Sequence, residues 1–351
     1  MDYLAQADLL GPPPAPIVDI HAHINGPEAS LVYDRARRAF GVRRVYSMTP
    51  ISMAAGVRER LGDAIRFIAI PSWNLADRYH AHTRGYLTDI ERFATEMGSR
   101  MLKLWCAPAL RGYLGPDAPD IADIDSPWRR EHCRLGMQLG MMFMCHVGDP
   151  DTWFATKYSD RAAFGLKPHV YVGLRRMLDL FPRPWIAAHM GGWPEDLDAL
   201  DRLLEAHPNL HLDCSATRWI VRELSRHPRS QTAGFLTKWR TRVLFGSDIV
   251  ALDDHLRPDK STGSIKSDQA NSPEAALDLY ASRYWCLRTM FESTGITPSP
   301  VSDPDLAMVA PARHTSADQP RITGLGLPRD HLIDLYATNA QRLVESWWER
   351  S

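Results

Sequence analysis

Short apolar runs recur along most of the chain, and a longer segment with helical spacing of its hydrophobic residues separates each run from the next. Several of the runs are nearly continuous in hydrophobic residues, which is typical of strands that are covered on both faces of a parallel sheet. The pattern predicts eight strands, at residues 17–21, 42–48, 65–71, 101–105, 141–146, 185–189, 210–214 and 243–247.

Helical spacing is clearest in five of the intervening segments, at residues 31–40, 87–97, 128–139, 170–181 and 195–206. The last of these begins after Pro194 with acidic residues in its first turn and ends at His207 and Pro208, which are normal start and stop signals. Eight strand–helix units within about 250 residues match the size of a (β/α)8 barrel. We therefore predict a single α/β domain, a TIM barrel whose core spans about residues 16–250.

The chain continues well past the eighth predicted strand. Residues 253–273 are rich in Asp, Ser, Lys and Gly, a helical segment follows at 273–293, and residues 297–320 are rich in Pro and Ser. Connections of this length are usually functional lids or surface excursions. Because this one leaves from the end of a barrel strand, we expect the insert of about residues 253–328 to be a lid or to shape the substrate pocket. A closing amphipathic helix is predicted at 329–349.

Polar residues capable of chemistry stand at or near the carboxyl ends of the predicted strands. They are Asp19, His21, His23, Lys103, His146, His189 and Asp248. The carboxyl ends of parallel barrel strands meet at one rim, where such barrels hold metals and perform catalysis. A single histidine in this position is more often a core residue bonded to backbone, but the recurrence at four strand ends favours a metal site.

His21 and His23 are two residues apart at the end of a strand, so both side chains point to the same side and can hold one metal ion. The pair alone is weak evidence, because histidines at this spacing often arise by chance. Asp19 lies on the same face and could orient one of the metal-binding side chains by a hydrogen bond. His146 is the candidate third ligand, and Asp248 either binds the metal or takes a proton from its water.

Two of these residues have several interpretations. His189 precedes Met-Gly-Gly, where the glycines permit a sharp turn, and it is either a ligand of a second metal or a general acid and base. Lys103 lies in an apolar strand, where its charge must be paired, neutralised or modified. The alternatives are a CO2-modified lysine that bridges two metals, a cationic anchor for a substrate carboxylate, and a side chain that extends to water beside Trp105.

Residues close behind the strand ends are candidates for contacts with substrate. Arg218 suits a carboxylate or phosphate because a guanidinium gives bidentate recognition, although a surface arginine on a helix is an equal alternative. Asp149 is a second candidate, with the N-cap of a helix after Pro150 as its alternative. Packing between barrel and helices explains the tryptophans at least as well. These tryptophans are Trp73, Trp105 and Trp193, and Trp153 is a further residue expected to shape the pocket.

The composition limits the classes of partner. The 351 residues are 44% hydrophobic and 24% charged, and a net charge of −1 gives no reason to expect nucleic acid or an anionic membrane surface as a partner. The five cysteines are scattered without a Cys-x-x-Cys pair, so we expect free thiols in a reducing compartment. The amino terminus lacks the basic and apolar regions of a signal peptide. A cytoplasmic protein that binds a small molecule is therefore expected.

Taken in order, the motifs resemble those of the amidohydrolase superfamily. Within it, the chain is most similar to the amidohydrolase-related group that includes aminocarboxymuconate semialdehyde decarboxylase. The resemblance extends from about residue 16 to residue 345. The motifs that carry it are Asp19-x-His21-x-His23, Lys103, His146, His189-x-Gly-Gly, Phe-Gly-Ser-Asp248 and Asn339-Ala-x-Arg342-Leu.

The resemblance implies a metal centre and its ligands. In that group one divalent ion, most often Zn²⁺, is expected on His21, His23, His146 and Asp248. His189 would then orient and deprotonate the water. Mn²⁺ or a binuclear centre is an alternative, because some members of the superfamily bridge two metals with a carboxylated lysine at the position of Lys103. The resemblance also implies a homodimer.

Three functions follow from this chemistry. The first is a metal-dependent hydrolase that uses activated water on a small amide, ester or lactone carrying an anionic group. The second is a metal-dependent, non-oxidative decarboxylase of an unsaturated or aromatic carboxylic acid. The third is a non-catalytic barrel that binds metal. The joint presence of all the expected ligands and a proton-transfer histidine favours an enzyme.

Overall fold

The computed structural model describes residues 1–73, 75–115, 119–261 and 266–350. Its internal contacts divide the chain into two compact units. Unit 1 comprises Met1–Phe67, Cys214–Ser302 and Gln319–Val344, and unit 2 comprises Ile68–Asp213, Asp303–Asp318 and Glu345–Ser351. Each unit therefore combines segments that are far apart in the sequence.

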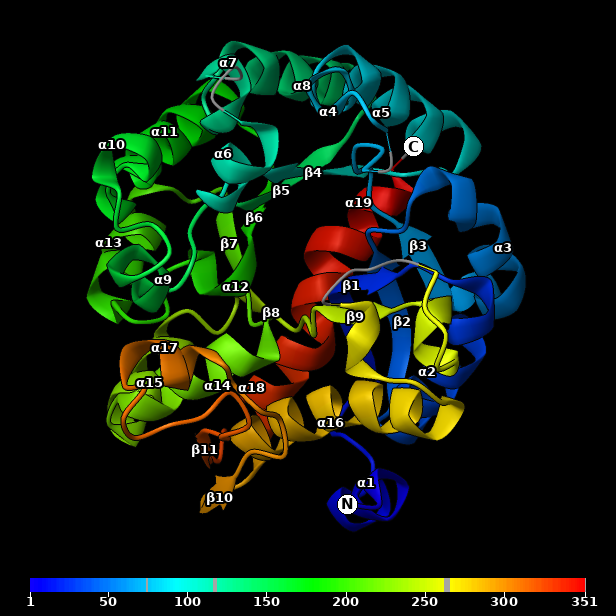
Figure 1. Ribbon diagram of the computed structural model, residues 1–351, viewed down its shortest axis with the longest axis vertical. Coiled ribbons are helices and arrows are strands. Elements are labelled where there is room, and N and C mark those ends of the chain that lie inside the picture. Colours follow the sequence, from blue (N-terminus) through cyan, green and yellow to red (C-terminus); the bar gives the residue numbers. More distant parts are fainter. Residues whose placement is uncertain (74, 116–118, 262–265, 351) are drawn as a thin grey trace. The chain divides into compact units, whose positions relative to one another are not determined.

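All eight predicted strands are present in the predicted order, and helices separate them along the chain (Figure 1). The pairings among the first seven strands within each unit are parallel. The prediction of a parallel α/β fold with eight successive strand–helix units is confirmed. The strands are β1 (Ile17–Ile24), β2 (Val42–Ser47), β3 (Ile65–Phe67), β4 (Met101–Trp105), β5 (Met142–His146), β6 (Trp185–Ala187), β7 (Leu210–Asp213) and β8 (Val243–Leu244).

The larger sheet of unit 1 has the strand order β3-β2-β1-β9. The central strand β1 pairs in parallel with β2 on one side and with β9 (Ile249–Ala251) on the other, where Ala22 lies opposite Ile249. Seven of the eight residues of β1 are buried, so both faces of the strand are covered, including the face that carries Asp19 and His21. The sequence did not predict β9, because three residues are too few to show a period.

The sheet of unit 2 contains β4, β5, β6 and β7 in this order. Its register places Trp105 beside His146 at the carboxyl ends of β4 and β5. The main connecting helices lie close to the predicted segments. They are α5 (Arg84–Glu96), α8 (Pro127–Gln138), α11 (Lys167–Leu180) and α13 (Leu197–Ala206).

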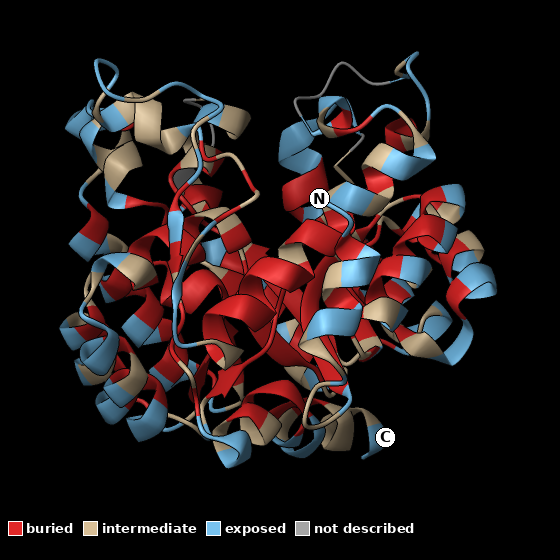
Figure 2. Ribbon diagram, turned by 90° about the horizontal axis from the view of Figure 1, so that it is seen from below, coloured by how far each residue is buried: buried red, intermediate tan, exposed pale blue. Residues whose placement is uncertain are grey.

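Helix α13 shows why such segments become helical. Leu200, Leu203 and Leu204 recur at helical spacing and are buried, while the side chain of Asp196 accepts the N–H of Ala199 at the amino end of the helix. Figure 2 shows the same division in other elements, with buried residues in the strands and exposed residues on the outer faces of helices. Hydrophobic spacing and a polar cap together fix where this helix begins and which face is covered.

Much of the insert is packed into unit 1. Helix α16 (Pro273–Glu292) is buried on most sides and contacts α2 (Pro27–Ala39). The side chain of Asp253 accepts the N–H of Ala29 in the first turn of α2, and His255 contacts the hydroxyl of Tyr280 on α16 at 2.9 Å. The described part of residues 253–273 is therefore anchored in unit 1, and residues 262–265 lie outside the described residues. The function of this segment as a lid stays a prediction.

The predicted closing helix is present over its predicted range. It consists of α18 (Arg329–Ile333), two π-helical stretches at Asp334–Thr338 and Gln341–Glu345, and α19 (Ser346–Glu349). The carbonyl of Leu335 accepts the N–H of Phe245, the residue after β8. Asn339 and Arg342 then bond to carbonyls of the segment around β8. This late motif therefore holds β8 in place.

The structure describes the state of the cysteines and the hydrophobicity of the helices. All five cysteines are buried and free, as their scattered spacing predicted. None of the described helices combines the length and the hydrophobicity that a membrane span requires.

Candidate metal centre

Two histidines and one aspartate come together in unit 1. His21 and His23 project from the same side of β1, and their ring centroids lie 5.7 Å apart. The Oδ1 atom of Asp248 lies 3.5 Å from Nε2 of His21 and 3.3 Å from Nε2 of His23. One donor atom from each residue lies within 4.8 Å of the other two, a spacing that suits one metal ion. The structure thus brings three of the four predicted ligands together.

The backbone directs Asp248 toward this point. Asp248 has a φ of 57°, in the left-handed region that aspartate tolerates better than most residues. The N–H groups of Ser247 and Asp248 lie 3.2 and 2.8 Å from the carbonyl oxygen of His21, to which both donate. These bonds hold the turn after β8 against β1. The left-handed residue then places its carboxylate beside the two imidazoles.

Asp19 organises the backbone beneath the histidines. Its Oδ1 accepts the N–H groups of His21 and Ser247, and its Oδ2 accepts the hydroxyls of Ser247 and Tyr284, at 2.6 and 2.9 Å. Burial raises the pKa of Asp19 to about 7, and the hydrogen bonds with Ser247, His21 and Tyr284 act in the opposite direction. Asp19 therefore positions the main chain of His21 and the turn at Ser247 by direct hydrogen bonds.

Ser215 contacts the ring of His21 and was not predicted from the sequence. Its Oγ lies 3.1 Å from Nδ1 of His21, and the serine is fully buried. A hydroxyl in this position fixes the orientation of the ring and leaves Nε2 directed at Asp248. A serine shortly after a strand has no distinguishing pattern in a sequence, so only the structure identifies it.

Replacing Ser215 by alanine should weaken binding of a divalent metal about 10- to 100-fold, as loss of a group that orients a metal ligand does. Competition with a metal-binding dye measures the affinity. Ser30→Ala is the matched control, because Ser30 is also buried in unit 1 but its hydroxyl donates to the carbonyl of Gly26. Equal affinities for the two variants would show that Ser215 has no part in metal binding.

In unit 2, the ring of His146 is oriented by two oxygen atoms. Its Nε2 lies 3.1 Å from Oδ1 of Asp149 and 3.0 Å from the carbonyl oxygen of Gly148. Both are acceptors, so Nε2 carries the proton and Nδ1 is left with the lone pair. Asp149 is buried and also accepts the hydroxyl of Tyr158 at 2.7 Å. The side chain of Asp149 thus supports His146, while its contact with substrate stays a prediction.

His189 is held next to His146 by an unusual backbone. His189 has a φ of 58°, its N–H donates to the carboxylate of Asp213, and its ring lies 4.5 Å from that of His146 in an edge-to-face arrangement. The following Gly192 has a φ of 77°, and a Cβ there would lie 2.8 Å from the backbone of Gly148. The expected sharp turn after His189 is present, and Asp213 is a further contact that the sequence did not predict.

Lys103 lies within β4 with 6% of its surface exposed, and its Nζ atom is buried. The interpretation in which this side chain extends to water is therefore wrong. Burial raises the pKa of the Cys145 thiol, and the charge of Lys103 acts in the opposite direction. Whether Lys103 bridges metals or anchors a carboxylate stays a prediction.

Three of the predicted substrate residues in unit 2 lie among other aromatic rings. Trp73 and Trp105 contact each other, with ring centroids 5.1 Å apart. Trp153 belongs to α9 (Asp151–Ala155), 6.1 Å from the ring of Tyr158, and the Nζ atom of Lys157 lies 3.4 Å from its ring centroid. The contacts of Trp73 and Trp105 fit the packing alternative for these two residues.

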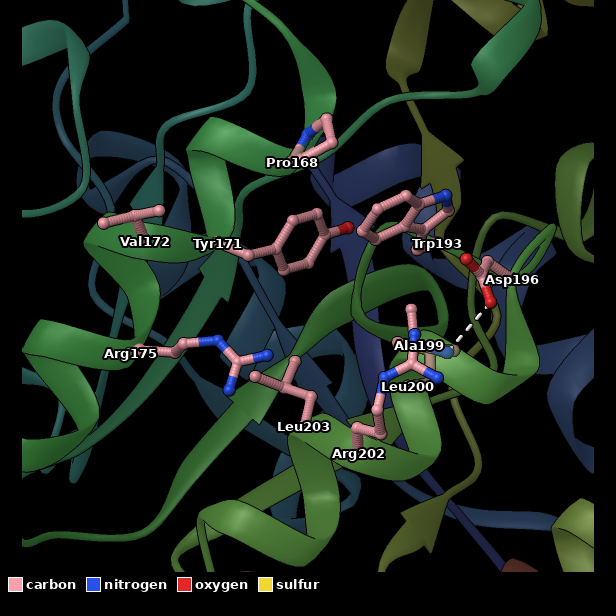
Figure 3. A pocket seen from close by; sticks show the side chains of 10 residues that line it. All are labelled: Pro168, Tyr171, Val172, Arg175, Trp193, Asp196, Ala199, Leu200, Arg202 and Leu203. Carbon is pink, nitrogen blue, oxygen red and sulfur yellow. Dashed lines mark hydrogen bonds between the residues drawn. The ribbon is translucent and has the colours of Figure 1, made fainter.

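Trp193 lines a pocket of about 200 Å³ between α11 and α13. Its ring stacks on that of Tyr171 at 4.9 Å, and Figure 3 shows both rings on one side of the pocket, with the guanidinium groups of Arg175 and Arg202 on the other. None of the predicted metal ligands is among the residues that line this pocket. Contact between Trp193 and substrate stays a prediction.

Arg218 begins α14 (Thr217–Arg226) in unit 1 and acts on a second arginine that the sequence did not single out. Burial and the charge of Arg218 lower the pKa of Arg283, on α16, to about 10, while the charge of Asp248 raises it. Two guanidinium groups therefore interact electrostatically in the same unit as Asp248.

Comparisons with known proteins find similarity in solved structures. No protein-family model and no curated protein matches the chain. The 2,6-dihydroxybenzoate decarboxylase from Rhizobium is 13% identical, with a TM-score of 0.47, and the match covers 94% of this chain and 98% of that one. The 5-carboxyvanillate decarboxylase from Novosphingobium aromaticivorans, solved with manganese and 4-hydroxy-3-methoxy-5-nitrobenzoic acid, is 11% identical, with a TM-score of 0.46 over 97% of each chain.

A protein named as a probable 2-pyrone-4,6-dicarboxylic acid hydrolase, from Acinetobacter baumannii, is also similar. It is 10% identical, with a TM-score of 0.45, and the match covers 77% of this chain and 92% of that one. The solved structures that this chain is similar to therefore include two decarboxylases and a hydrolase.

Proposed function

We propose that this chain is a metal-dependent hydrolase that acts on a small amide, ester or lactone. The observation that carries the proposal is the convergence of His21, His23 and Asp248 in unit 1. The order of the motifs along the chain, with its resemblance to the amidohydrolase superfamily, supports the same function. A metal centre of this kind is the part of the chain most directly suited to hydrolysis.

The donor set fits a divalent transition metal. Two imidazole nitrogens and one carboxylate oxygen are ligands that Zn²⁺ and Mn²⁺ both accept, and we propose Zn²⁺ as the resident ion. Ser215 fixes one ring from behind, as an outer hydrogen-bond partner does in metal sites. A further ligand is needed for a four-coordinate site, and the resemblance assigns this place to His146.

A bound divalent ion would supply Lewis acidity, polarising a carbonyl group and lowering the pKa of a coordinated water. The protein side chains would perform the proton transfers. Asp248 has 23% of its side chain exposed and lies within 3.5 Å of both imidazoles, so its carboxylate can accept a proton from water and pass it to the leaving group. Its position is fixed by the bonds from Ser247 and its own N–H to β1.

We assign the remaining roles to two histidines of unit 2. The protonated Nε2 of His146 donates toward Asp149, which orients the ring and leaves Nδ1 as the atom able to bind a metal. His189 is buried, and its backbone is tied to Asp213. An imidazole held in this way suits a proton shuttle, because the ordinary pKa of histidine lies near neutral pH.

The substrate is proposed to carry an anionic group. Arg218 and Arg283 supply positive charge in the unit that contains Asp248, and their mutual repulsion would be relieved by an anion. A carboxylate attached to the amide, ester or lactone would meet this requirement through paired hydrogen bonds.

The test of this function is metal-dependent hydrolysis. Protein purified without added metal is analysed for metal content, and then assayed against small amides, esters and lactones that carry a carboxylate. We expect hydrolysis that stops when a chelator removes the metal and returns with Zn²⁺ or Mn²⁺. Release of CO2 from unsaturated or aromatic acids, without hydrolysis of any compound in the panel, would replace the hydrolase by a decarboxylase.

The same assay tests His189. In His189→Gln, hydrolysis should fall about 10²- to 10⁴-fold, the usual contribution of a general acid–base group, while the metal content stays unchanged. His169→Gln is the control, because His169 is an exposed histidine of the same unit. Loss of a metal equivalent in His189→Gln would make His189 a metal ligand and would favour a binuclear centre.

A further inference from the structure

His82 is a buried histidine whose polar atoms have no partner. It lies in the last turn of α4 (Arg78–His82) in unit 2, and none of its surface is exposed. Within the part of the chain that the structure describes, neither Nδ1 nor Nε2 of His82 has a hydrogen-bond partner. A buried polar group without a partner costs folding free energy, so an apolar side chain of similar size would be more stable here.

The neighbours of His82 are aromatic rings. The ring centroids of Trp73 and Tyr113 lie 4.6 and 5.7 Å from that of His82, and both contacts are edge-to-face. Trp105 completes the group, 5.1 Å from Trp73 and 6.1 Å from Tyr113. We call these four residues the aromatic cluster. It gathers His82 from α4, Trp105 from the end of β4, Tyr113 from α6 (Ala109–Leu114) and Trp73 from the segment between β3 and α4.

His82 is fully buried within the cluster, whereas the other three members are partly exposed. Trp73, Trp105 and Tyr113 are each only partly buried, so the cluster as a whole is not sealed from solvent. The hydroxyl of Tyr113 reaches the carbonyl of Trp73 at 3.4 Å, a long hydrogen bond. Contacts between rings therefore hold the cluster together, and a planar molecule can replace such contacts without leaving strong hydrogen bonds unmade.

His82 is electrically neutral in this environment. Burial lowers its pKa to about 3, and the charge of Arg129 acts in the same direction. Arg129 is itself buried and donates from Nη2 to the carbonyl oxygen of Trp105, at 3.1 Å. A neutral imidazole has one N–H donor and one acceptor nitrogen. It can therefore recognise an uncharged polar group, such as a hydroxyl.

We propose that the aromatic cluster binds a planar conjugated ring that carries an uncharged hydrogen-bonding group, and that His82 recognises this group. The rings of Trp73, Trp105 and Tyr113 provide stacking surfaces, and the unpartnered imidazole provides the polar contact. The cost of burying His82 in the free protein is offset when a ligand satisfies one of its nitrogens. That this ligand is the substrate of the metal centre rests on the proposed function.

Three small probes separate the elements of this recognition. Phenol has a planar ring and a hydroxyl, toluene has the ring alone, and cyclohexanol has the hydroxyl without a planar ring. Each is titrated into ¹⁵N-labelled protein, and the indole N–H signals of Trp73 and Trp105, assigned with Trp→Phe variants, report binding at the cluster. We expect saturable shifts of both signals with phenol, weaker binding of toluene, and no shift with cyclohexanol.

Replacing His82 isolates its contribution. In His82→Phe, the Kd for phenol should rise about 10-fold, the effect of losing one hydrogen bond, whereas the Kd for toluene should stay unchanged. The thermal unfolding midpoint should equal or exceed that of the wild type, because an unsatisfied polar group is removed. His82→Gln keeps a donor and an acceptor, so it should retain the preference for phenol over toluene.

Several results would overturn the inference. An unchanged Kd for phenol in His82→Phe, or a clear fall of its unfolding midpoint, would make His82 a structural residue. Loss of the phenol preference in His82→Gln would contradict recognition by hydrogen bonding. These titrations involve neither turnover nor metal. Hydrolysis without phenol binding would therefore overturn this inference alone, and binding without metal-dependent hydrolysis would overturn the proposed function alone.

Discussion

In Asp248→Asn, the Kd for a divalent metal should rise more than about 100-fold. This loss of affinity is larger than the loss that follows removal of an outer hydrogen-bond partner. The carboxylate supplies the only negative charge among the three donors that meet in unit 1, within 3.5 Å of both imidazoles. An amide oxygen in the same place is a neutral and weaker ligand. Metal content after dialysis and a dye competition titration measure this loss, and hydrolysis should fall with it.

Asparagine is chosen because it can keep the backbone conformation that Asp248 has in the wild type. Asp248 has a φ of 57°, and asparagine tolerates this region far better than alanine, which would add strain unrelated to metal binding. Asp253→Asn is the matched control, because Asp253 caps α2 in the same unit and asparagine is an equally good cap. Metal affinity of Asp248→Asn equal to that of the control would remove Asp248 from the centre.

Asp19→Ala should have the largest effect on stability, lowering the free energy of unfolding by about 3 kcal/mol or more. Four donors lose their acceptor in this variant: the N–H groups of His21 and Ser247, and the hydroxyls of Ser247 and Tyr284. Asp19 is fully buried, so water does not replace the carboxylate without a change in packing. Urea unfolding of the metal-free protein measures this difference.

Tyr284→Phe is compared with Asp19→Ala because it removes only one of the hydrogen bonds to Asp19. It removes one of the four donors, and also the contact with the hydroxyl of Tyr33 at 2.7 Å, while keeping the ring, so its effect should be about 2 kcal/mol. The two variants also separate stability from metal binding. Asp19→Ala frees the N–H of His21 and should weaken metal affinity, whereas Tyr284→Phe should leave the affinity near that of the wild type. Equal stability of the two variants would show that the Asp19 hydrogen bonds do not stabilise the fold.

The strands could be predicted because their signal is local. In β1, Val18, Ile20, Ala22 and Ile24 are apolar at every second position, which is the period of a strand and can be seen within a few residues. Strand ends were less certain: β1 continues to Ile24, past the predicted end at residue 21. Its last residues pair with β9, and a strand of three residues has no recognisable period.

The donors at the candidate metal centre were also visible in the sequence. His21 and His23 are two residues apart on a strand, so their common direction follows from strand geometry alone. Ser215 is different. Its contact with His21 joins residues 194 positions apart, and a buried serine resembles any other serine in a sequence. The support of His146 by Asp149 was missed for a related reason, because the orientation of a ring depends on side-chain contacts.

By itself, the sequence determined the eight strands, the intervening helices and the residue types that could bind a metal. These features depend on the spacing of residues that are close together in the chain. The tertiary structure decided which donors meet and how they are oriented: the left-handed turn at Asp248, the network around Asp19 and the contact from Ser215. It also revealed His82, whose ring nitrogens have no hydrogen-bond partner among the described residues. Such features depend on packing between distant segments, which no local pattern encodes.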